Sequence, residues 1–176
     1  MKLILGGVLA FCLALSAKNC HANEQIVDGR GVGDFIIGQV PPRLGEERLV
    51  SRQWQEDENG KRYERLEARV AGIPVDVEVH DGRIWRITVM RRGLRTRDGS
   101  QVGDRLQKLM RMNRSLRREL GPGPSLVLFP KDLCGISYMT DADLPESVMR
   151  DPSTDLPATF VREARIRWIF VTGCKT

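Results

Sequence analysis

The chain has 176 residues, of which 41% are hydrophobic and 29% are charged, and 28 basic against 23 acidic residues give it a net charge of +5. This length and composition predict one folded domain and exclude a disordered or collagen-like chain.

The N-terminal segment predicts export. Lys2 precedes an apolar run over residues 3–17, and a short polar stretch then ends on Ala22. The run falls short of the roughly 20 residues that span a bilayer. We therefore expect a signal peptide over residues 1–22, with cleavage after Ala22 or, as second choice, after Ala17. An uncleaved membrane-anchoring helix is the alternative.

Residues 23–176 then form a single exported domain, periplasmic or secreted, without stable membrane insertion. Cleavage removes Cys12 and Cys20 and leaves Cys134 and Cys174 as a pair. In an oxidising compartment such a pair predicts a disulfide, whose loop closure stabilises the fold by about 4 kcal/mol. The close Cys/His spacing of a zinc site is absent, so we expect neither a metal nor a cofactor.

Strands are predicted in the first half of the domain at residues 35–37, 49–55, 63–70, 73–79 and 84–90. Over residues 73–79 apolar residues alternate with polar ones, which places Asp76, Glu78 and His80 on one polar face. The Asp81-Gly82 pair predicts a hairpin. A bulge near Trp85 is needed to set Glu78 opposite Arg86 while keeping the other face apolar.

A long helix is predicted next, from Arg105 to Leu120. Asp104 is the expected N-cap, and Gly121-Pro122 supplies the stop. The apolar stripe of this helix comprises Leu106, Leu109, Met110, Leu116 and Leu120.

The remainder predicts strands at residues 125–129, 134–139 and 164–171, separated by a long loop over residues 141–157. In the last strand Ile166, Trp168 and Phe170 are expected on one face, with Arg165 and Arg167 on the other. The predicted fold class is α+β: an antiparallel sheet of roughly six to eight strands, with one long amphipathic helix packed on one face and one disulfide.

A short motif occurs twice. Residues 28–34 (DGRGVGD) and 98–104 (DGSQVGD) are identical at five of seven positions. Reuse of the same turn chemistry is the preferred interpretation, and an ancient duplication is the alternative.

No catalytic motif is found. Residues 23–176 contain one histidine, His80, and no Gly-x-Ser-x-Gly elbow, so we assign no catalytic residue and expect a protein that is not an enzyme. The strand face of Asp76, Glu78 and His80 is the place where an enzyme of unrecognised type could act or a metal could bind. A solvated face with Glu78 paired to Arg86 is preferred.

Basic residues concentrate over residues 83–118, which hold twelve Lys and Arg against two acidic residues, a balance of +10. Such a cluster either solvates the fold or binds an anionic partner. Nucleic acid is excluded as a partner, because export separates the chain from it and no aromatic residues alternate with these arginines. The candidate surface comprises Arg91, Arg92, Arg95, Arg97, Arg105, Lys108, Arg111, Arg114 and Arg118.

These features favour a non-enzymatic domain that binds another protein, either inhibitor-like or immunity-like or as an envelope assembly factor. Two alternatives remain open. The first is an enzyme that uses the strand face around His80, and the second is a binder of anionic envelope surfaces that uses the arginine cluster.

Overall fold

The computed structural model describes residues 26–113, 115–151 and 153–174. The predicted signal peptide, its cleavage site and Arg114 lie outside these ranges. The described residues form twelve strands in two sheets and three short helices. None of these three helices combines the length and apolar character needed to cross a membrane.

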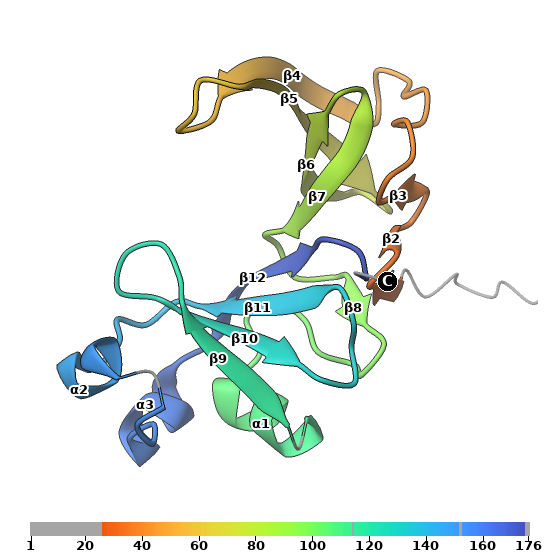
Figure 1. Cartoon of the computed structure of the whole chain (residues 1–176). Helices are drawn as coiled ribbons and strands as arrows, with labels where there is room; N and C mark the ends of the chain where they lie inside the picture. Colours follow the sequence, from red (N-terminus) through yellow and green to blue (C-terminus); the bar gives the residue numbers. More distant parts are fainter. Residues whose placement is uncertain (1–25, 114, 152, 175–176) are drawn as a thin grey trace, which may run out of the picture.

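The large sheet has eight antiparallel strands in the order β4-β5-β6-β7-β12-β11-β10-β9, which fan from the top to the bottom of Figure 1. Its strands are β4 (Leu49–Glu56), β5 (Arg62–Val70), β6 (Ile73–His80), β7 (Arg83–Val89), β9 (Leu116–Leu120), β10 (Leu126–Pro130), β11 (Ile136–Thr140) and β12 (Ile166–Val171).

The small sheet has the order β3-β2-β1-β8 and lies beside the junction of β7 and β12. Its strands are β1 (Ile26–Asp28), β2 (Gly31–Val32), β3 (Phe35–Ile36) and β8 (Arg95–Thr96). The helices α1 (Leu106–Met112), α2 (Glu146–Arg150) and α3 (Ala158–Glu163) lie at the lower end of the molecule in Figure 1.

The hairpin between β6 and β7 has the predicted register. Asp81 and Gly82 adopt positive φ (52° and 75°), as a tight two-residue turn requires. Glu78 pairs with Arg86, and the register shift that follows leaves Trp85 as the extra residue of a bulge. The predicted bulge is confirmed: it keeps the apolar residues of both strands on one face.

The predicted fold class, with its long helix from Arg105 to Leu120, is wrong. The helix ends at Met112, Asn113 has extended backbone geometry (φ −114°, ψ 101°), and Leu116–Leu120 forms strand β9. Leu116 and Leu120 are four residues apart, a spacing that puts two side chains on one face of either a helix or a strand. Pairing with β10 decides for the strand, and Gly121-Pro122 forms part of the turn between β9 and β10.

Two smaller predictions also need correction. Asp104 is not the N-cap of α1, since Arg105 occupies that position, and Asp104 instead accepts hydrogen bonds from the Gln101 amide (3.1 Å) and Lys108 Nζ (2.7 Å). The expected loop over residues 141–157 contains helix α2. Its burial of Val148 against the core gives this polar segment the tertiary contact that a five-residue helix needs.

The apolar core lies on one face of the large sheet. Helix α1 contributes Leu106 and Leu109 to it, α2 contributes Val148 and α3 contributes Phe160. Burying each such side chain is worth about 1.5–3 kcal/mol, so this face fixes the position of the helices. The sheet contributes Leu66, Ala68, Val75, Val77, Ile87, Val89, Leu126, Leu128, Tyr138, Ile169 and Val171, and the small sheet contributes Val27, Val32 and Phe35.

The strand order also bears on the repeated motif. One copy precedes strands β4 to β7, the other precedes β9 to β12, and the two four-stranded units join through their last strands with Thr88 opposite Phe170. Gly33 and Gly103, at equivalent places in the motif, both have positive φ (61° and 84°). Each copy of the motif therefore precedes one four-stranded half of the large sheet.

Candidate functional site: the open face of the large sheet

The large sheet has one covered and one open face. The helices and the small sheet bury their apolar side chains in the same core cluster, so the opposite face carries no second layer of described residues. We call this opposite surface the open face. The registers place on it Ser51, Gln53, Gln55, Tyr63, Arg65, Glu67, Asp76, Glu78, His80, Arg86, Thr88, Ser137, Met139, Trp168 and Phe170.

Two cross-strand ion pairs occupy the β5–β7 part of the open face. Arg86 donates to Glu78 Oε1 from Nε (2.9 Å) and Nη2 (2.5 Å), which confirms the predicted pair. Arg65 forms an ion pair with Asp76. Asp76 and Glu78 are only 5% and 8% exposed, so the guanidinium groups provide the charge compensation that buried carboxylates require.

Aromatic rings and guanidinium groups form a continuous stripe across the same face. The Tyr63 and His80 rings stack at 4.9 Å, and the His80 and Trp85 centroids are 5.1 Å apart. The Arg86 guanidinium lies 5.3 Å from the Trp85 ring and 5.6 Å from the Phe170 ring. Cation–π contacts of this kind hold the rings in fixed orientations.

The stripe continues along β12, a central strand of the large sheet. The Phe170 and Trp168 centroids are 6.0 Å apart in an edge-to-face arrangement, and the Arg167 guanidinium lies 4.7 Å from the Trp168 ring. Strand β12 thus turns Trp168 and Phe170 outward, while Ile169 and Val171 are buried. The prediction that Ile166 shares a face with Trp168 and Phe170 is wrong, because a register shift beside Ile166 turns that residue into the core.

A recess of about 260 Å³ lies beside the stripe, lined by Ser51, Gln53, Arg65, Glu67, Asp76 and Met90. A second recess, of about 390 Å³, shares Glu67 and Met90 with the first and extends to Arg91, Arg167 and Trp168. The two recesses therefore adjoin each other on the open face, and we refer to them together as the groove.

The residues of the enzymatic alternative share this face, but the structure gives them other contacts. Arginines engage Asp76 and Glu78, and His80 is stacked between Tyr63 and Trp85, with its Nε2 accepting and donating no hydrogen bond within the described protein. Among the described residues, no group of three or more His, Cys, Asp or Glu side chains is placed to hold a metal ion.

The arginine cluster is distributed over several elements rather than one helix face. Arg92 and Lys108 both approach Asp104 (3.7 and 2.7 Å), and Arg95 donates to the Gly99 carbonyl (3.3 Å). Arg118 lies on β9 and donates to the carbonyls of Thr154 (3.0 Å) and Ser153 (3.2 Å). Of the others, Arg91, Arg97, Arg105 and Arg111 are exposed.

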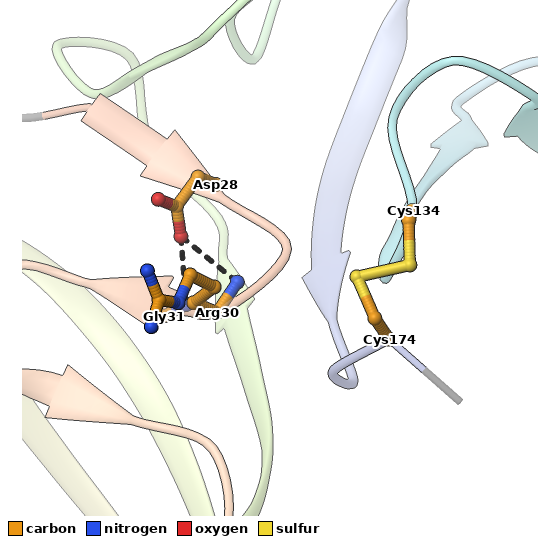
Figure 2. Close-up of a disulfide and its surroundings, with 5 residues drawn as sticks. All are labelled: Asp28, Arg30, Gly31, Cys134 and Cys174. Atoms are coloured by element: carbon orange, nitrogen blue, oxygen red, sulfur yellow. Dashed lines mark hydrogen bonds between the residues drawn. A yellow bond between two sulfur atoms is a disulfide. The ribbon is translucent and has the colours of Figure 1, made fainter. Parts of the chain in front are cut away.

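The predicted disulfide is present. Cys134 and Cys174 are bonded with their α-carbons 5.2 Å apart, and the bond joins the turn before β11 to the segment after β12 (Figure 2). In the turn after β1, Asp28 Oδ1 accepts hydrogen bonds from the backbone amides of Arg30 (2.8 Å) and Gly31 (3.1 Å), also drawn in Figure 2.

The second copy of the motif contains a buried polar network centred on Asp98. Its carboxylate accepts hydrogen bonds from Thr96 Oγ1 (2.5 Å), Asn113 Nδ2 (2.7 Å) and the Ser100 amide (3.1 Å). Burial acts to raise the pKa of Asp98, but these hydrogen bonds outweigh it and hold the pKa below its ordinary value. Burial, reinforced by the negative charge of Asp98, raises the pKa of Tyr138, whose hydroxyl lies 3.1 Å from Thr96 Oγ1.

Sequence reasoning missed Tyr63, Trp85, Trp168 and Phe170 as members of one surface. A usable signal existed for Tyr63, which the strand pattern places opposite His80 once the register of β5 and β6 is known. Trp85 becomes a neighbour of Trp168 and Phe170 only through the pairing of β7 with β12, whose residues are about eighty positions apart in the chain.

The fold and this surface define the class of protein: a mostly β domain built on one eight-stranded antiparallel sheet with one covered and one open face. The structure is similar to the crystal structure of the uncharacterized protein YfeY from Escherichia coli, with a TM-score of 0.61 and 17% sequence identity, over 84% of this chain and 99% of that chain. At this identity the similarity shows a shared fold. No protein-family model matches the chain, and the comparison with curated proteins finds no relative.

Proposed function

We propose that this chain is an exported, non-enzymatic domain that binds another protein through the open face of its large sheet. The disulfide supports an oxidising location, periplasmic or secreted, because such bonds persist mainly there.

The observation that carries the proposal is the stripe of Tyr63, His80, Trp85, Arg86 and Phe170, on a sheet face that no second layer of described residues covers. Trp, Tyr and Arg dominate the binding energy of protein interfaces, since they bury large surfaces and make directional contacts from rigid side chains. Trp85 is 51% exposed and held by two neighbours, so it is available to a partner at a small cost in side-chain entropy.

Two kinds of partner relationship fit such a surface. An inhibitor or immunity protein blocks its partner by occupying a site, and an envelope assembly factor holds its partner in place. Both need a preorganised recognition face and no catalytic residue. The identity of the captured partner distinguishes them.

The test uses two exposed tryptophans on opposite faces of the sheet. A photocrosslinking amino acid is placed at Trp85 on the open face or at Trp54, which is 62% exposed on the side of β4 that pairs with Glu64. The exported protein is crosslinked in envelope extract and the product identified by mass spectrometry. Alanine substitutions at the same two positions measure the contribution of each ring to affinity for the captured protein.

We expect one protein crosslinked at position 85 and not at position 54. Trp85→Ala should weaken the complex by about 30-fold, the effect of a hot-spot residue worth at least 2 kcal/mol, and Trp54→Ala should leave it unchanged. Equal crosslinking at both positions, or binding unaffected by Trp85→Ala, overturns the proposal. Competition by a single-stranded oligonucleotide also counts against it, because bases stack on the same side chains.

A further inference from the structure

Asp76 is the most enclosed charged side chain of the open face. Its side chain is 7% exposed, and Arg65 forms an ion pair with its Oδ2. Oδ1 is sealed from solvent and accepts no hydrogen bond from the described protein. A buried carboxylate oxygen without a donor is energetically costly, so a group that donates to Oδ1 is strongly favoured there.

The surroundings of Asp76 offer further acceptors and an excess of negative charge. Glu67 lies directly opposite Asp76 in the β5–β6 pair, and both line the recess with Gln53 and Ser51. Arg65 and Arg86 are engaged by Asp76 and Glu78, which leaves Glu67 without a cation in this ladder of described side chains. Two carboxylates therefore face one guanidinium across the recess, and the net negative charge of its lining favours a cationic ligand.

We infer that this recess is an ammonium site that takes a lysine side chain of the protein bound at the open face, an inference that rests on the proposed function. An ammonium group carries three donors on one small atom, which suits acceptors converging from Asp76, Glu67 and Gln53. A planar guanidinium needs a wider, bidentate acceptor, and Arg65 already engages Asp76. Met90 provides an apolar wall for the aliphatic part of the lysine.

Entry of the ammonium requires only side-chain motion. Gln53 on the edge strand β4, Arg65 on β5 and Met90 supply walls made of long side chains with several rotatable bonds. The Arg65 side chain is 42% exposed, so it exchanges rotamers readily while keeping its charge near Asp76.

The groove adds a requirement on the sequence around that lysine. Beyond Glu67 and Met90 its lining turns basic, with the exposed side chains of Arg91 and Arg167 beside Trp168. The ligand is therefore a segment in which a carboxylate follows or precedes the lysine within a few residues.

The test measures binding of small probes to the exported protein by ¹H–¹⁵N NMR. Nα-acetyl-lysine N-methylamide is titrated, and the same derivative of norleucine, which lacks the ammonium group, is the control. We expect saturable shifts confined to strands β4 to β7 with the lysine probe and none with the norleucine probe. Absence of saturable shifts with the lysine probe at tens of millimolar overturns the inference.

Two variants locate the site. Glu67→Gln removes the carboxylate without breaking an ion pair and should weaken lysine binding about tenfold, whereas Glu64→Gln, on the other face of β5, should have no effect. Asp76→Asn should abolish binding, and its thermal unfolding shows whether the fold persists. A Lys-Gly-Glu peptide, acetylated at its N-terminal α-amine and with a free lysine side chain, should bind more tightly than the same derivative of Lys-Gly-Gln. Arg167→Gln should remove that difference in affinity.

The outcomes for the site and for the proposed function are separable. If a protein is crosslinked at position 85 and its affinity is unchanged by Glu67→Gln, the ammonium site is overturned and the proposed function stands. Binding of the lysine probe without any protein crosslinked at position 85 overturns the proposed function and leaves the ammonium site standing.

Discussion

Gly29 packs so closely against Cys134 that a β-carbon at position 29 would lie 1.7 Å from the Cys134 carbonyl oxygen. The turn after β1 thus rests directly on the residue that anchors the disulfide, and the small sheet is held against the end of the β11–β12 pair. Backbone cannot move aside as a flexible side chain can, so only glycine fits there.

The first prediction follows from this contact. Gly29→Ala should lower the free energy of unfolding by about 1–3 kcal/mol, the usual cost of overpacking, as measured by urea denaturation. Gly45→Ala is the control, since its nearest neighbour is the flexible carboxylate of Glu47. A Gly29→Ala variant as stable as the control would contradict the close packing.

The second prediction concerns the disulfide, which closes a loop with a sequence separation of 40 residues. Replacing Cys134 and Cys174 together by serine should cost about 4 kcal/mol, because the unfolded chain regains the entropy of an open loop. Thermal unfolding of the oxidised protein measures the effect. Intact mass before and after reduction and alkylation establishes the bond beforehand, and two thiols that alkylate without reductant would refute it.

The third prediction compares two Arg–Glu pairs on opposite faces of the sheet. Arg86→Gln leaves the buried Glu78 carboxylate without its charged donor and should lower the free energy of unfolding by about 1–3 kcal/mol. Arg52→Gln breaks the pair with Glu64, in which Arg52 is 58% exposed, and should cost at most about 1 kcal/mol. Equal decreases in the free energy of unfolding for Arg86→Gln and Arg52→Gln, measured by urea denaturation, would show that burial of Glu78 does not raise the cost of losing its partner.

The fourth prediction concerns pH. Asp98 has a pKa below its ordinary value in the folded protein, so its charged form stabilises the fold above the unfolded-state pKa of about 3.9. That stabilisation is lost as the pH falls through the folded-state pKa. At pH 7 Asp98→Asn should therefore lower the free energy of unfolding by about 1–3 kcal/mol.

The pH series provides the check on Asp98. Unfolding by urea is followed from pH 7 to pH 2.5, and the gap between the wild type and Asp98→Asn should narrow below about pH 4. The exposed Asp132→Asn serves as the control, with a stability near that of the wild type at pH 7. If the difference in free energy of unfolding between the wild type and Asp98→Asn stays constant down to pH 2.5, the destabilisation comes from the changed shape of the side chain and not from its lost charge.

The fifth prediction separates two members of the arginine cluster. Arg118→Gln removes hydrogen bonds to the carbonyls of Ser153 and Thr154 and should lower the free energy of unfolding by about 0.5–1.5 kcal/mol. Arg111→Gln, on exposed helix surface, should change it by less than about 0.5 kcal/mol. Neither change should flatten the salt dependence of partner binding, and a flattened dependence for Arg111→Gln would favour the anionic-surface alternative.

The sequence predicted local structure well where one physical signal dominated. The alternation over residues 73–79 and the Asp81-Gly82 turn determine the β6–β7 hairpin, its bulge at Trp85 and the pairing of Glu78 with Arg86. The pair of Cys134 and Cys174 predicted the disulfide. Each of these features depends on neighbours in sequence or on an unambiguous count of residues.

After Met112 the spacing of the apolar residues is compatible with both a helix and a strand. Leu116 and Leu120 suit either a helix or a strand, and only the free edge of β10 decides for a strand by pairing five residues with it. Likewise, the apolar residues at 168–171 fit either face of β12, until pairing with β7 and β11 buries Ile169 in the core and leaves Phe170 half-buried on the open face.

The chain by itself thus determined the hairpins, the charge pattern and the covalent link. Only the tertiary structure decided the open face, because its stripe and its recess join side chains from β4, β5, β6, β7 and β12. The reason is physical: the side chains of paired strands meet through backbone hydrogen bonds between segments distant in sequence, and local periodicity carries no information about which strand becomes the neighbour.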